Sequence, residues 1–267
     1  MADFLLPGYS IPGLGFNHSC LRWYPSNAPQ EWPAKNPALF DACMSLRLYC
    51  PNYNHIAGAF RVGDLDYLIH QKALYELKSP WCPDTTKHYK ATDIKAASAI
   101  ADHIAEISGT GPSRITTGLI FFSHVTLGQV KSYQLATLGL FAALEALFVP
   151  NGNKARTISD RVSRFLEGFE FSVNLDEWVR NAYVSERDQL AHGIHDATFD
   201  TEMRPNLIES FGRLHEICRL SLLGFLSMDN AELEKLEKSR GKALQALLDD
   251  RGPAAGDLVD NQRNWAK

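Results

Sequence analysis

Apolar residues recur at helical spacing through most of the chain beyond residue 110. The stretch 115–148 is apolar on nearly all sides, which is typical of helices at the centre of a bundle, and Gly128 marks a break within it. A tight turn at 150–153 follows. Later segments carry apolar stripes that also predict helices: 175–192, from 201–205 to about 226, and 231–248.

The first 110 residues have a more mixed pattern. Proline and glycine punctuate residues 1–37, which excludes a long helix or a central strand. We expect an ordered arm there, with a disordered arm as the alternative. Helical spacing returns over 38–49 and 92–107, and 55–62 has the character of a strand.

Together these patterns predict a mainly α protein in three parts. The linker Ser-Gly-Thr-Gly-Pro-Ser at 108–113 separates the first two parts. Residues 1–110 are expected to form a smaller mixed α/β region of unassigned function, with a sensor or regulatory contact as one hypothesis. Residues 111–250 are expected to form a helical bundle, and residues 251–267 a loose C-terminal tail.

The charge balance limits how the protein can meet nucleic acid. The formal net charge is −4, from 27 Lys and Arg against 31 Asp and Glu. No global basic field attracts RNA, so an RNA-binding role needs a local basic surface. The best candidate follows the turn at 150–153, although a solvated helix face is the other interpretation. Its basic residues are Lys154, Arg156, Arg161 and Arg164.

Cysteine use and hydropathy indicate the compartment. The five cysteines are odd in number and form no Cys-x-x-Cys pair, which favours reduced thiols. The N-terminus has no basic segment followed by an apolar one, so we expect no signal peptide and a cytoplasmic location. The apolar run 135–149 is short for a membrane span and contains Glu145, so no membrane association is expected.

The densest group of reactive side chains lies near the end of the predicted helix 175–192. Arg187, Asp188 and His192 occur within six residues, and Gly193 is a typical helix stop. In a helix, Asp188 and His192 lie one turn apart on one face. Histidine can transfer a proton and arginine can hold phosphate oxygens, which suits phosphodiester cleavage without a metal or another cofactor. An ordinary capped helix with a surface charge pair has the same spacing.

The order Arg187-Asp188-x-x-x-His192 resembles the Arg-polar-x-x-x-His motif of the HEPN superfamily, especially its ApeA-like branch. Segments 138–148 and 157–166 resemble the family's apolar helix with an embedded glutamate and its next helix. The resemblance covers roughly residues 114–227 and implies that the bundle is HEPN-like. Asp188 is a departure to note, since asparagine or histidine is also frequent at that position.

What the resemblance implies is a metal-independent endoribonuclease. His192 would assist attack of the ribose 2′-hydroxyl on the adjacent phosphate, Arg187 would hold the phosphate, and Asp188 would position His192. The products would be a 2′,3′-cyclic phosphate and a 5′-hydroxyl. Such proteins commonly form homodimers with a composite active site at the interface. They often serve bacteria as antiphage defence or toxin-type effectors.

Three further residues could support this site. A carboxylate in an apolar helix needs a partner, because an unpaired buried charge is costly. Glu145 therefore either makes a structural pair, at the helix end or with an arginine, or faces the cleft of Arg187 and His192. Tyr183 could stack an RNA base, and His195 lies just beyond the motif.

Two other functions stay open. A noncatalytic module of the same fold would bind RNA, a nucleotide or a partner chain without cutting RNA. A zinc site is the other hypothesis, because His-x-x-His at a helix-to-loop junction can ligate zinc. Its ligands would be His192, His195, Asp196 and Cys218.

Overall fold

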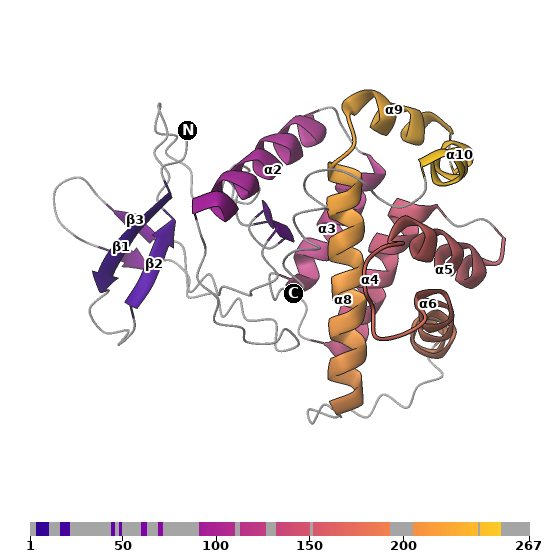
Figure 1. The fold of residues 1–267 in the computed structure, drawn as a ribbon. Coiled ribbons are helices and arrows are strands. Elements are labelled where there is room, and N and C mark those ends of the chain that lie inside the picture. Colours follow the sequence, from indigo (N-terminus) through magenta and orange to yellow (C-terminus); the bar gives the residue numbers. More distant parts are fainter. Residues whose placement is uncertain are drawn as a thin grey trace.

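A computed structural model describes the chain in segments, most of them helical. The described residues are 4–10, 17–21, 44–45, 48–49, 60–62, 69–71, 91–109, 113–126, 132–149, 152–192, 205–239 and 241–251. Helices account for most of this part of the chain, which confirms the predicted mainly α class. Figure 1 shows them gathered around one long, nearly upright helix.

The helical elements are labelled in chain order. They are α2 (Ala91–Gly109), α3 (Arg114–Thr126), α4 (Tyr133–Phe148), α5 (Lys154–Phe165), α6 (Leu175–Ala182), the π-helix η2 (Tyr183–Asp188), α7 (Gln189–Ala191), α8 (Pro205–Leu226), α9 (Asn230–Ser239) and α10 (Lys242–Arg251).

Two predicted helices are subdivided in the structure. The segment 175–192 consists of α6, η2 and α7, so its centre is a π-helix rather than a continuous α-helix. The segment 231–248 was predicted as one helix and contains parts of two, α9 and α10. Gly241 lies between them with φ +95°, a conformation that glycine adopts without strain. The break predicted at Gly128 lies outside the described residues.

Four short strands are described in the N-terminal region. Strand β1 (Phe4–Ser10) pairs antiparallel with β2 (Asn17–Leu21), and β3 (Phe60–Val62) pairs antiparallel with β4 (Ile69–Gln71). The end of the predicted strand at 55–62 coincides with β3. Most of the predicted arm, the predicted helix 38–49 apart from four helical residues, and the predicted tail lie outside the described residues.

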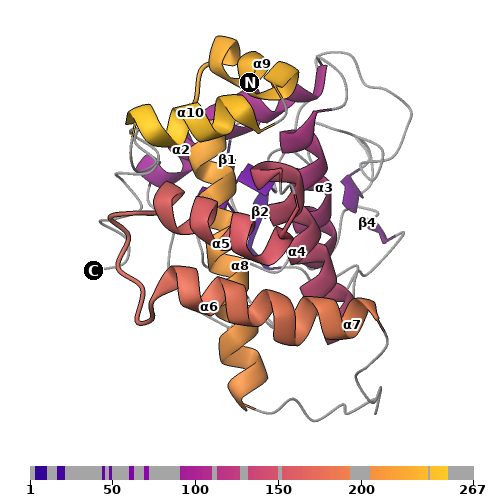
Figure 2. The same cartoon turned by 90° about the vertical axis from the view of Figure 1, so that its right-hand side faces the viewer.

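The core of the bundle forms around α8. This helix contacts α2, α3, α4 and α5, and in Figures 1 and 2 it passes through the middle of the bundle. Helices α3 and α4 approach closely because glycines leave room at their interface: a Cβ on Gly139 would lie 3.0 Å from a methyl of Val125. An aromatic group closes the centre, with Phe165 stacked on Phe225 at 4.7 Å between ring centroids.

Two buried arginines tie segments of the fold together. Arg219 on α8 pairs with Glu216 and donates to the carbonyl of Leu48, 2.6 Å away, so it joins the bundle to the N-terminal region. Arg161 on α5 donates to the carbonyls of Phe148 and Val149 at the end of α4. A cation at a helix C-terminus satisfies carbonyls that have no partner within the helix.

Replacing Arg161 by alanine should destabilise the bundle. The guanidinium also donates to the carbonyl of Gly241, which keeps its bond from the Gln245 N–H. Loss of Arg161 therefore removes a donor from the Phe148 and Val149 carbonyls and should lower the free energy of unfolding by about 3 kcal/mol. Urea unfolding followed by circular dichroism measures this change. Arg164→Ala is the matched control, because Arg164 lies on the same helix and makes an exposed pair with Asp249. Equal midpoints for the two variants would contradict the assignment.

Among the described helices, none combines the length and the apolar character needed to cross a membrane.

Candidate functional site

Glu145 is the centre of a polar cluster that joins three elements. One of its carboxylate oxygens, Oε1, accepts the Tyr183 hydroxyl at 2.7 Å and the Arg187 Nε at 3.0 Å. The Arg187 Nη2 lies 2.9 Å from the same oxygen. The other oxygen, Oε2, pairs with Lys154 Nζ at 3.2 Å. The arginine pair that sequence reasoning allowed for Glu145 is therefore present, and its arginine is that of the motif.

This packing favours the charged forms of both partners. Burial opposes ionisation of Glu145, but hydrogen bonds from Tyr183 and Lys154 and the charge of Arg187 lower the pKa of its carboxyl. Burial likewise opposes the charge on Arg187, but the neighbouring carboxylate of Glu145 raises its pKa. The guanidinium also lies over the Tyr183 ring, with 5.1 Å to the centroid. Arg187 is thus a fixed, permanently charged group.

Tyr183 takes a different position from the one predicted. Its side chain is only 1% exposed, and its ring meets Phe141 edge-on at 5.3 Å. Burial and the Glu145 carboxylate raise the pKa of its hydroxyl. A ring held in this way cannot stack an RNA base, so Tyr183 supports the site through Glu145 instead.

The π-helix directs two consecutive residues inward. Arg187 reaches Glu145 on α4, while Glu186 accepts the Tyr133 hydroxyl at 3.2 Å and the Ser210 hydroxyl at 2.7 Å. The wider turn of a π-helix accommodates both directions, and such turns are frequent at functional sites. Sequence reasoning missed Glu186 and the π-helix, because an α-helical period was assumed through the whole segment.

The relation between Asp188 and His192 differs from the predicted one. The Asp188 carboxylate accepts Arg187 Nη1 at 3.0 Å, and its backbone carbonyl accepts the His192 backbone N–H at 3.0 Å. Among the described residues, no hydrogen bond or ion pair joins the two side chains. His192 is exposed at the end of α7, where its imidazole can meet a substrate. His195 lies outside the described residues.

The four residues of the predicted basic surface do not form one RNA-binding surface in the structure. Lys154 pairs with Glu145, and Arg164 pairs with Asp249 on α10 at 2.6 Å. Arg161 is 7% exposed and satisfies main-chain carbonyls, so it belongs to the core and not to an RNA-binding surface. Arg156 is exposed and makes no side-chain hydrogen bond or ion pair within the described part of the chain. Of the four residues, only Arg156 offers an unengaged cation.

The zinc hypothesis loses one of its four ligands. Cys218 is fully buried on α8, and its thiol donates to the Leu140 carbonyl. Burial raises the pKa of this thiol, which opposes the thiolate that zinc requires. His195 and Asp196 lie outside the described residues. Within the residues that are described, no three His, Cys, Asp or Glu side chains gather closely enough to hold a metal ion.

The charge of Glu145 should make stability depend on pH. Its pKa is lowered in the folded state, so its contribution is present above the ordinary value of about 4.5 and is lost as the pH falls through the folded value. We expect Glu145→Gln to be less stable than the wild type at neutral pH. The difference in urea midpoint should begin to shrink below about pH 4.5 and should disappear once the pH is below the folded-state pKa of Glu145. A difference that is constant from pH 7 to 3 would contradict this linkage.

In chemical terms, the site combines an exposed imidazole with a guanidinium held by two carboxylates. The guanidinium can bind an anion and the imidazole can transfer a proton. Searches of protein-family models, curated proteins and solved structures found no match to this chain.

Proposed function

We propose that this protein is a metal-independent endoribonuclease of the HEPN type that acts in the cytoplasm as a bacterial defence or toxin-type effector. The observation that carries the proposal is the placement of Arg187. Glu145 fixes this arginine at a π-helix, five residues before the exposed His192. An anchored cation, followed five residues later by an accessible proton-transfer group, suits cleavage of a phosphodiester.

In the proposed reaction, His192 removes the proton from a ribose 2′-hydroxyl. The oxygen attacks the adjacent phosphorus, the bond to the 5′ oxygen of the next nucleotide breaks, and that oxygen takes up a proton. Each terminal nitrogen of Arg187 carries a second N–H that no described residue accepts. These two donors would hold the phosphate as negative charge builds on it. The products are a 2′,3′-cyclic phosphate and a 5′-hydroxyl.

The proposal includes a homodimer with the two motif copies in one composite site. Pairing would place two Arg187 side chains near one RNA strand and so offset the acidic balance of the chain. A regulatory partner that acts through residues 1–110 also stays a prediction. The contact of Arg219 with Leu48 gives this region a direct connection to α8.

Cleavage of total cellular RNA in the presence of a chelator tests the proposed reaction. We expect the wild type to produce fragments that end in 2′,3′-cyclic phosphate and begin with 5′-hydroxyl. A ligase that joins only a 2′,3′-cyclic phosphate end to a 5′-hydroxyl end identifies these products. Activity that appears only when a divalent metal is added, or fragments with 3′-hydroxyl ends, would contradict the proposal.

A noncatalytic RNA-binding module is the second candidate. The observation in its favour is that Arg187 is already engaged by Glu145 and Asp188, which reduces its capacity for phosphate. This candidate predicts a folded protein that binds RNA and leaves it intact under every metal condition. Gel-shift and cleavage assays on the same RNA separate the two candidates.

A further inference from the structure

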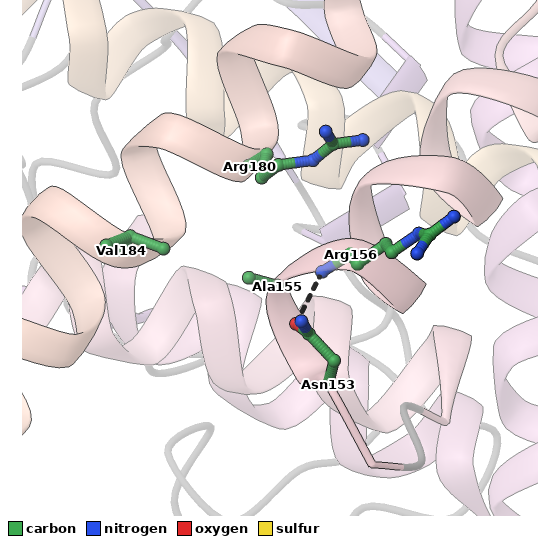
Figure 3. Close-up of a pocket in the computed structure, with 5 residues that line it drawn as sticks. All are labelled: Asn153, Ala155, Arg156, Arg180 and Val184. Carbon is green, nitrogen blue, oxygen red and sulfur yellow. Dashed lines mark hydrogen bonds between the residues drawn. The ribbon is translucent and has the colours of Figure 1, made fainter.

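A pocket opens between α5, α6 and the π-helix. Its volume is about 330 Å³, which lies in the usual range for small-ligand sites. Figure 3 shows the start of α5 on one side and the α6–η2 segment on the other. The lining residues are Asn153, Ala155, Arg156, Arg180 and Val184.

The polar groups that line this pocket favour an anion. Arg156 and Arg180 belong to different elements, and Figure 3 shows their guanidinium groups extending toward the same side. Arg156 has no side-chain partner in the described part of the chain. Arg180 makes a single contact of 2.6 Å to Asp176, on its own helix. Exposed pairs of this kind are weak, so a ligand can compete for the guanidinium.

No carboxylate is among the lining residues, and the oxygen of the one amide side chain among them is already hydrogen-bonded. Asn153 Oδ1 accepts the backbone N–H of Arg156 at 3.2 Å, which caps α5. Val184, 52% exposed, supplies an apolar wall opposite the charged end. Two guanidinium groups on one side of the pocket and an apolar wall on the other fit a phosphate with an attached sugar.

The pocket adjoins the candidate catalytic cluster. Lys154 lies between Asn153 and Ala155 and pairs with Glu145, which also holds Arg187. Val184 directly follows Tyr183, the other partner of Glu145. A strand with one phosphate at Arg187 could therefore continue into the pocket with a neighbouring phosphate.

We propose that this pocket is a phosphate subsite for single-stranded RNA, in which Arg156 and Arg180 hold a backbone phosphate next to the one at Arg187. The choice of RNA as the ligand rests on the proposed function. Arg180 was not among the predicted RNA-binding residues, because it lies outside the basic segment 154–164 in the sequence.

Direct RNA binding tests the subsite without relying on cleavage. The protein is the full chain with His192→Ala, and the probe is a fluorescently labelled 12-nucleotide RNA followed by anisotropy. Arg156→Ala and Arg180→Ala should each weaken binding about tenfold, the loss expected for one charge-assisted contact. The double variant should also lower the slope of log K against log salt by about 0.7, the value for one phosphate of a single strand.

The double variant Lys235→Ala/Lys238→Ala is the charge-matched control. Both lysines are exposed on α9, which Figure 2 shows at the opposite end of the bundle from α6. We expect this control to retain wild-type affinity. Equal losses in the two double variants would mean a general charge effect and would overturn the subsite, as would an RNA affinity that neither double variant changes.

Two further results separate the subsite from the proposed reaction and from another phosphate source. RNA that is bound through Arg156 and Arg180 but never cut by the wild type would support the subsite and contradict the nuclease. If the wild type and the arginine double variant cut RNA equally well at limiting RNA concentration, the nuclease would be supported and the subsite contradicted. Binding of inorganic phosphate with no RNA binding would overturn RNA as the ligand.

Discussion

The His192→Ala variant is expected to lose RNA cleavage by a factor of about 10² to 10⁴, the usual contribution of a general acid or base. His192 is exposed at the end of α7 and immediately follows the segment that carries Arg187. Its removal takes away a proton acceptor while leaving the Glu145 cluster intact. Initial rates on a short labelled RNA, measured with chelator, give the effect.

The loss should affect turnover and not RNA affinity. An exposed side chain with no hydrogen bond to another described side chain can be truncated with little effect on folding. His124→Ala is a suitable control, since His124 is exposed on α3 and has no place in the proposed reaction. Cleavage by His192→Ala at the wild-type rate would reject His192 as the proton-transfer group and, with it, the assigned mechanism.

Arg187→Ala should reduce the cleavage rate by about 10² to 10³, as does removal of one group that stabilises transition-state charge. Here a second effect is expected, because Arg187 also neutralises Glu145 in a partly buried position. Without it, Lys154 is the one cationic partner that Glu145 keeps among the described residues. The variant should therefore be less stable than the wild type, and its rate must be compared at a temperature where both proteins are folded.

Arg187→Lys distinguishes charge from geometry. Lysine keeps the charge but lacks the fork that reaches Glu145 and Asp188 from separate nitrogens. We expect Arg187→Lys to recover much of the stability and little of the activity. Recovery of both would show that a point charge suffices at this position, and full activity of Arg187→Ala would exclude Arg187 from phosphate binding.

The elements of the bundle were largely predictable because apolar periodicity is a local property. The stripe over 92–107 and the nearly all-apolar stretch 115–148 predicted α2, α3 and α4 with small errors at their ends. The divisions at Gly241 and at the π-helix were not predicted, since each interrupts a continuous helical stripe at a single turn.

The sequence predicted which residues belong to the candidate site better than it predicted the contacts between them. Their spacing identified Arg187 and His192 as candidates. Glu145 was identified because a carboxylate is unusual in an apolar helix. Spacing also suggested that Asp188 contacts His192, whereas its side chain pairs with Arg187. Glu186 gave no signal, because its partners Tyr133 and Ser210 come from distant parts of the chain.

By itself, then, the sequence determined which stretches become amphipathic or buried helices, and which reactive residues occur near each other along one of them. Tertiary structure decided whether each charged side chain is buried, paired or exposed. Arg156 and Arg161 lie on one helix with similar neighbours, yet Arg156 lines a pocket while Arg161 closes the end of α4. The reason is physical: burial and ion pairing depend on which side chains and carbonyls a neighbouring helix presents, and local spacing contains no record of that neighbour.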